Sequence, residues 1–68
     1  MKLGELLKSR REALGMSLQD VADACGITKS HVWDMEQGNS FNPTLAVAIR
    51  LSICLGISIN ALAAATLE

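Results

Sequence analysis

The sequence predicts an all-α fold, a bundle of five short helices in one domain that spans residues 1–68. Apolar residues recur at helical spacing, and no segment outside the turns alternates with the period of two expected of a strand. Glycines and helix-capping residues also divide the chain into short segments. We therefore expect helices over about 3–14, 18–25, 29–37, 45–55 and 59–65.

The first helix is indicated by a stripe of leucines. Leu3, Leu6, Leu7 and Leu14 recur at a spacing close to 3.6 residues, which places them on one face. Gly15 is expected to end this helix.

The second and third helices lie within residues 15–38, GMSLQDVADACGITKSHVWDMEQG. Ser17 and Thr28 are natural N-caps, and Asp20 follows Ser17 at the spacing of a capping box. Gly26 supplies the left-handed residue that ends the second helix, and Gly38 ends the third. Two short capped helices joined by a tight turn are typical of the helix-turn-helix, whose second helix enters the major groove of DNA.

The fourth and fifth helices follow a polar turn at residues 39–43. Pro43-Thr44 starts the fourth helix and Gly56 ends it. Ile57-Ser58 starts the fifth helix. The core face of the fourth helix is expected to hold Leu45, Ala48, Ile49, Ser52 and Leu55.

Composition excludes several classes of protein. Half of the 68 residues are hydrophobic, and a chain of this length buries only about 60% of its unfolded surface. The sequence shows no catalytic constellation, so we expect no enzyme and no small-molecule substrate. Cys25 and Cys54 are 29 positions apart beside a single histidine, so we expect no metal, no cofactor and no disulfide, and a cytoplasmic protein. The apolar segment 45–67 is interrupted by polar residues, so we expect no membrane span.

Charge is distributed unevenly along the chain. Net charge is −1; residues 1–16 carry a balance of +2, whereas residues 17–42 hold Lys29 against four acidic residues, a balance of −3. A nucleic-acid-binding surface is usually basic, so the acidic motif predicts modest affinity for DNA.

Helix geometry selects the candidate base-reading residues. With Val32 and Met35 facing inward, Ser30, Asp34 and Gln37 face outward, and Lys29 and Ser30 stand at the start of the helix. Lysine suits guanine O6 and N7, and a carboxylate accepts from cytosine N4. Free backbone N–H groups after Ser17 and Thr28 are natural phosphate donors. The alternative is that Lys29 and Ser30 are ordinary solvated residues.

Taken together, the segments L-G-M-S, D-V-A, C-G-I-T, V-W-D-M-E-Q-G, N-P-T-L and L-G-I-S resemble the lambda-repressor-like helix-turn-helix family (Cro/repressor or XRE type) from residue 6 to about residue 62. The resemblance implies a five-helix transcriptional regulator of bacterial or phage type. Such a protein is usually a homodimer on a palindromic operator in double-stranded DNA, and a repressor is the preferred interpretation.

The resemblance also implies site residues. Base reading falls on Lys29, Ser30 and Asp34, and a structural ion pair on Arg11 and Glu36. The expected contacts to the DNA backbone, including the cap identified above, are Arg11, Ser17, Leu18, Thr28, Gln37, Asn39, Ser40 and Asn42. Two features depart from the family: Leu18 stands where members commonly carry glutamine, and residues 39–42 lack a basic side chain.

Trp33 and Phe41 are the two aromatic residues. We interpret Trp33 as a structural residue that packs against the loop and Phe41 and covers the fourth helix. The alternative is contact with the DNA backbone or with a protein partner.

The C-terminal segment is apolar on more than one face, which suggests self-association. The expected dimer surface comprises Ile57, Ile59, Leu62 and Ala63. A dimer would set half-sites about 34–36 Å apart. A further domain could cover the same residues instead, or the helix end could simply fray. The acidic motif and Leu18 keep a second function open, a helical interaction module or antitoxin-like protein with weak or lost DNA binding.

Overall fold

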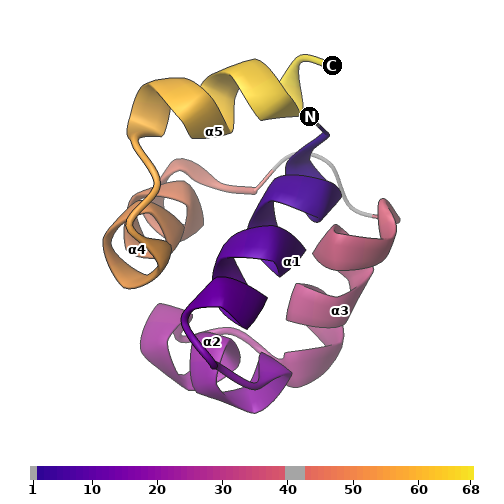
Figure 1. The fold of residues 1–68 in the computed structure, drawn as a ribbon, viewed down its shortest axis with the longest axis vertical. Helices are drawn as coiled ribbons and strands as arrows, with labels where there is room; N and C mark the ends of the chain where they lie inside the picture. The colour runs from indigo at the N-terminus through magenta and orange to yellow at the C-terminus, as the bar shows by residue number, and fades with distance from the viewer. Residues whose placement is uncertain (1, 40–42) are drawn as a thin grey trace.

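The computed structural model describes residues 2–39 and 43–68. Five helices follow in the order α1 (Leu3–Ala13), α2 (Leu18–Cys25), α3 (Lys29–Gln37), α4 (Leu45–Leu55) and α5 (Ile59–Thr66). In Figure 1, α1 runs through the middle of the molecule between α3 and α4, and α2 and α5 lie at opposite ends. No strand occurs in the described ranges. The all-α expectation is confirmed, with the helix-turn-helix at α2 and α3.

Helix starts follow from local capping chemistry. Ser17, Thr28, Thr44 and Ser58 each accept a hydrogen bond from the backbone N–H three residues later. In α2 the cap is reciprocal, because the Ser17 N–H also donates to Asp20 Oδ2 at 2.8 Å. That backbone hydrogen bond, with the one from the Ser17 side chain, lowers the pKa of Asp20. Each of these four helices therefore begins at the residue that its cap indicates.

The turn between α2 and α3 depends on a glycine. Gly26 adopts a left-handed conformation with φ of 67°, and its N–H donates to the Ala22 carbonyl. A Cβ at this position would be strained and would also lie 2.9 Å from a guanidinium nitrogen of Arg50. The turn that sets the angle between α2 and α3 is thus fixed by the sequence.

The core draws residues from every helix and from the turn before α5. Its members are Leu3, Leu7, Val21, Ala22, Cys25, Val32, Met35, Val47, Leu51, Leu55, Ile57, Leu62 and Ala65. Leu14, which the sequence placed on the first stripe, is instead 47% exposed, because α1 has ended before it.

The expected core face of α4 is correct for Leu55 and wrong for Leu45 and Ile49. Val47, Leu51 and Leu55 are buried, whereas Leu45 is 74% and Ile49 is 44% exposed. The helix is apolar around most of its circumference, so periodicity alone did not identify the buried side.

Two arginines satisfy carbonyls at the ends of other helices. Arg10 Nε donates to the Leu55 carbonyl at 3.0 Å, and Arg50 Nη1 donates to the Cys25 carbonyl at 3.2 Å. A cation at a helix C-terminus satisfies a free carbonyl and interacts favourably with the helix dipole. These contacts tie α1 to α4 and α4 to α2.

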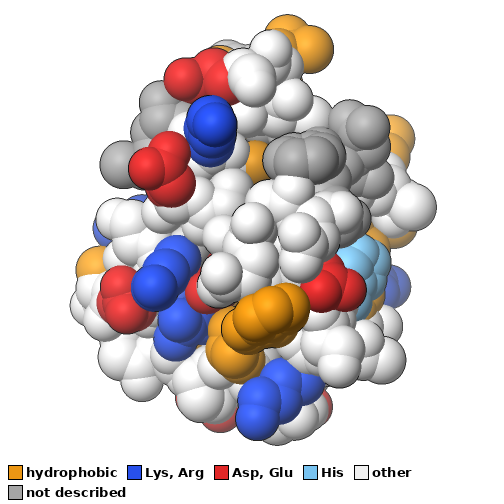
Figure 2. All heavy atoms as spheres, turned by 90° about the vertical axis from the view of Figure 1, so that its right-hand side faces the viewer, with side chains coloured by type: hydrophobic (Ala, Val, Ile, Leu, Met, Phe, Trp, Pro, Cys, Tyr) orange, Lys and Arg blue, Asp and Glu red, His pale blue; other side chains and the backbone are white. Residues whose placement is uncertain are grey.

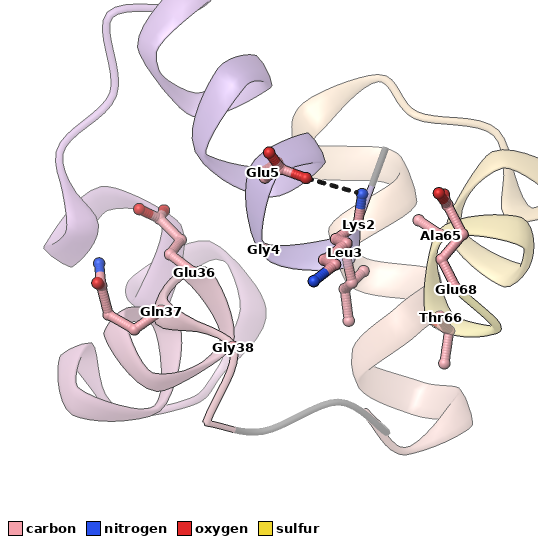
Figure 3. A pocket seen from close by; sticks show the side chains of 10 residues that line it. All are labelled: Lys2, Leu3, Gly4, Glu5, Glu36, Gln37, Gly38, Ala65, Thr66 and Glu68. Carbon is pink, nitrogen blue, oxygen red and sulfur yellow. Dashed lines mark hydrogen bonds between the residues drawn. The ribbon is translucent and has the colours of Figure 1, made fainter.

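A close backbone contact joins the start of α1 to the end of α3. A Cβ added to Gly4 would collide with the backbone carbonyl of Glu36 and lie 2.7 Å from that of Met35. Figure 3 shows the groove beside this contact, which is lined by the start of α1 and the ends of α3 and α5, with the Glu5 carboxylate directed at the backbone nitrogen of Lys2. The two ends of the described chain therefore lie together.

Both cysteines are free thiols. Cys25, the last residue of α2, is fully buried, and Cys54 packs against the same core. Burial, followed by the neighbouring Cys54 thiol, raises the pKa of Cys25 to about 11. Cys25 therefore stays protonated at neutral pH and packs as a small apolar residue.

Over residues 2–39 and 43–68, no helix has the length and hydropathy needed to cross a membrane. Within the same ranges, no group of three potential metal ligands comes together.

Candidate nucleic-acid interface

The helix-turn-helix is anchored to α1 by an ion pair. Arg11 Nε donates to Glu36 Oε2 at 2.7 Å, and Nη2 donates to Oε1 at 3.1 Å. Nη1 of Arg11 also donates to the Met16 carbonyl at 3.0 Å, just before α2. The two side chains are 14% and 3% exposed, so the pair is largely withdrawn from water. This is the ion pair that the family resemblance implies.

The same geometry bears on the second role expected of Arg11, a contact with the DNA backbone. The hydrogen bond to Glu36 raises the pKa of Arg11, and burial offsets part of that rise. Because the guanidinium is committed to Glu36 and Met16, its charge is neutralised within the protein. Arg11 therefore positions α3, and its contact with the DNA backbone stays a prediction.

The three residues expected to read bases lie around one hollow. Lys29 and Ser30 are exposed in the first turn of α3, and Asp34 is half-buried one turn later. With Leu18 from the start of α2 and Trp33 from α3, they line an open hollow of about 470 Å3. The outward side of α3 and the start of α2 thus form one continuous surface.

Trp33 is placed differently from the interpretation given above. Its side chain is 48% exposed and lines the hollow with Leu18 and Lys29. Figure 2 looks onto the α3 side of the molecule and shows hydrophobic side chains exposed near basic and acidic ones. Phe41, the expected partner of Trp33, lies outside the described residues.

The spacing of residues in the sequence indicates that Trp33 lies beside Lys29 and Ser30. Trp33 follows Ser30 by three residues and Lys29 by four, so it lies on the same side of the helix as both. The structural interpretation was preferred because Trp33 lies on the flank of the predicted helix and not on its outermost line.

The two helix starts differ as phosphate sites. At α2 the carboxylate of Asp20 already accepts from the Ser17 N–H, which places negative charge where an anion would bind. The first turn of α3 has no acidic residue and begins with Lys29. Positive potential at a helix start favours anions, so the start of α3 is the better phosphate site.

The remaining backbone candidates are spread over the surface. Ser17, Thr28, Gln37 and Asn39 are exposed. Gln37 lies at the far end of α3 and lines the groove of Figure 3, away from the hollow. Ser40 and Asn42 lie outside the described residues.

The expected dimer surface requires a correction. Ile57 is 5% and Leu62 is 3% exposed, so both belong to the core of the single chain. Ile57 precedes the Ser58 cap and turns inward with Leu62, which leaves Ile59 and Ala63 on the outside. These two line a shallow apolar groove between α4 and α5, together with Pro43, Leu45, Ala48, Leu62, Thr66 and Leu67.

Comparison with known proteins identifies the same helix-turn-helix. A family described as helix-turn-helix matches residues 7–62. The chain is 28% identical over 60 residues to the HTH-type transcriptional regulator SinR of Bacillus subtilis strain 168, an alignment that covers 88% of this chain and 54% of SinR. It is 36% identical over 60 residues to the HTH-type transcriptional regulator DdrOP3 of Deinococcus deserti, covering 88% of this chain and 46% of DdrOP3. The chain thus spans about half the length of these curated relatives.

Solved structures of SinR have the same fold as this chain. One is a crystal structure of SinR in complex with DNA, in which SinR is described as the master regulator for biofilm formation. It superposes with a TM-score of 0.81 at 28% identity, and the match covers 90% of this chain and 97% of that one. SinR in its complex with SinI superposes with a TM-score of 0.80 at 28% identity, covering 88% of this chain and 58% of that one.

Proposed function

This chain belongs to the helix-turn-helix family of lambda-repressor (XRE) type, and from that premise we propose that it is a sequence-specific DNA-binding transcriptional regulator that acts as a repressor. The convergence of Lys29, Ser30 and Asp34 on one hollow at the exposed start of α3 supports the proposal most directly. The fold shared with SinR, whose complex with DNA has been solved, supports it independently.

Each side chain at the hollow suits a different base edge. Lys29 is positioned at the first residue of α3 to donate to guanine O6 and N7. Ser30 donates or accepts with less selectivity, and Asp34 accepts from an exocyclic amine such as cytosine N4. Thr28 and the first N–H groups of α3 contact phosphate, with Ser17, Gln37 and Asn39 as flanking contacts.

A homodimer completes the proposal. Ile59 and Ala63 expose apolar surface beside Leu45, and a second copy would bury it. Two recognition helices on one duplex face then require a palindromic operator with half-sites about 34–36 Å apart. Sedimentation at micromolar protein tests this part, and a strict monomer contradicts it. The proposed regulator works in the cytoplasm without catalysis.

Selection of bound sequences from a random duplex pool at low salt tests the function. We expect an enriched inverted repeat for the native chain and its loss in Lys29→Ala. Lys2→Ala is the matched control, because it removes the same charge from the opposite end of the molecule, where Lys2 lines the groove of Figure 3. Recovery of no sequence above bulk DNA contradicts the proposal.

A second function is favoured by the negative charge of residues 17–42 and by the apolar side chains of the exposed Trp33 and the half-buried Leu18. Both features suit a protein-interaction or antitoxin-like module. The same selection separates the two functions, because a protein-binding module enriches no DNA sequence.

A further inference from the structure

The hollow at the start of α3 contains chemistry that the base-reading residues do not use. Three of its five lining residues are polar, but Leu18 and Trp33 are apolar, and Trp33 leaves 48% of its surface exposed. Val32 and Met35 supply the core contacts of α3, so this indole is not needed to fill the core. The exposed Trp33 and the half-buried Leu18 thus leave apolar surface inside the proposed base-reading surface, where an apolar partner would cover it.

Asp34 makes phosphate a poorer partner for this pair than an uncharged group, although Lys29 lines the same hollow. Asp34 lines the same hollow and would repel a phosphate group placed against Trp33. The major groove presents one apolar group at the base edges, the C5-methyl of thymine. A neutral methyl group can lie against Leu18 and Trp33 without meeting the repulsion from Asp34.

We infer that Leu18 and Trp33 form a subsite for the C5-methyl group of a pyrimidine, which in ordinary DNA is thymine, next to the base pair contacted by Lys29 and Ser30. The inference rests on the proposed function. It assigns a specificity role to Leu18, the residue that stands where related chains commonly carry glutamine, and to Trp33.

Leu18 and Trp33 reach the hollow from two different helices. Leu18 follows the Ser17 cap directly and is half-buried against the core, so its position is fixed. Trp33 approaches the same hollow from α3, one helical turn after Lys29. The methyl group would thus lie between a fixed aliphatic side chain and an aromatic ring.

The test uses the duplex recovered by the native chain in the selection described above. Each thymine is replaced in turn by deoxyuridine, which removes the methyl group and keeps every hydrogen-bonding group. We expect one position in each half-site at which the replacement weakens binding about four-fold, the effect of one buried methyl group. In Trp33→Ala and Leu18→Ala that four-fold penalty disappears.

Ile53→Ala is the matched control. It removes an apolar side chain that is 79% exposed on α4, outside the hollow, and should leave the penalty unchanged. Thermal melting of each variant shows that it is folded, and Trp33→Gln repeats the test if Trp33→Ala unfolds.

A second arm places 5-methylcytosine at each cytosine of the same duplex. Tighter binding by the native chain but not by Trp33→Ala supports the subsite with this source of the methyl group. If the duplex binds tightly but responds to neither modification, or if the penalty persists in both variants, the subsite is contradicted and the regulator stands. If no duplex is recovered at all, the regulator and the subsite fall together.

Discussion

Arg11 and Glu36 are the residues whose chemistry most directly positions the interface. Their carboxylate and guanidinium are only 3% and 14% exposed, so removing one partner leaves the other charge with little water to solvate it. We expect Arg11→Met to lower the free energy of unfolding by about 2–4 kcal/mol, toward the lower end of the range for buried pairs because Arg11 keeps some exposure.

Urea denaturation of Arg11→Met, followed by circular dichroism, provides the measurement. Lys8→Met is the control, since it removes an exposed cation from the same helix and should change stability by less than about 0.5 kcal/mol. Equal losses in the two variants would show that Arg11 and Glu36 contribute no more than a surface pair.

Because of the Cys25 thiol, the free energy of unfolding should depend on pH in the alkaline range. Its ordinary pKa of 9.0 is raised to about 11 by burial, so the unfolded chain loses the thiol proton before the folded chain does. The resulting stability is fully present below pH 9 and is lost as the pH rises towards 11. The native chain should therefore lose stability relative to Cys25→Ala between these values.

Chemical denaturation of both chains under reducing conditions, at intervals from pH 8 to pH 11, measures this difference. Subtraction of the Cys25→Ala curve removes the contribution of the lysines, which titrate in the same range. A difference that stays flat across the range contradicts the account of Cys25.

At the scale of elements, Gly4 lets the backbone of α1 approach the backbone at the end of α3. Gly4→Ala should destabilise the protein by about 1–3 kcal/mol although alanine favours helices, because the new Cβ meets backbone carbonyls of Met35 and Glu36 that cannot move aside. Ser9→Ala, at an exposed position of α1, should be neutral or slightly stabilising. Thermal unfolding compares them, and a Gly4→Ala chain as stable as the native one would contradict this packing.

Prediction from sequence succeeded for elements whose signals are local. Capping residues lie within three positions of the bonds they make, so α2, α3, α4 and α5 begin where the sequence indicates. The buried face of α4 was missed because the helix is apolar on most sides. The carbonyl contacts of Arg10 and Arg50 depend on which helix ends meet, and no local pattern encodes that.

The candidate site, like the fold, was predicted only in part from the sequence. Helical geometry pointed Ser30, Asp34 and Gln37 outward, and the family resemblance implied Lys29 with Ser30 and Asp34. The structure brings Lys29, Ser30 and Asp34 to one hollow and leaves Gln37 at the far end of α3. Neither argument assigned Trp33 to that group, because Trp33 was interpreted as a structural residue. Ile57 and Leu62 were assigned to a surface because periodicity cannot distinguish burial within one chain from burial between two.

At the scale of the whole molecule, few cations remain for DNA. Net charge is −1, Arg11 is paired with the Glu36 carboxylate, and Arg10 and Arg50 keep their charge but are held at helix ends by the carbonyls of Leu55 and Cys25. If Lys8 and Lys29 each neutralise one phosphate per subunit, a dimer should bind with a log–log salt slope of about −3.5. Fluorescence anisotropy at several salt concentrations measures it, and Lys8→Ala should reduce the slope by about 2. A slope near −10 would require many contacts beyond these two lysines.

The central claim is that the start of α3 and the start of α2 meet the major groove. A titration of the ¹⁵N-labelled chain with its selected duplex, followed by amide and indole NMR shifts, tests this residue by residue. The largest changes should fall on Leu18, Lys29, Ser30, Trp33 and Asp34, which line the hollow. Changes confined to the groove between α4 and α5, or none on α3 at saturating duplex, would contradict the claim.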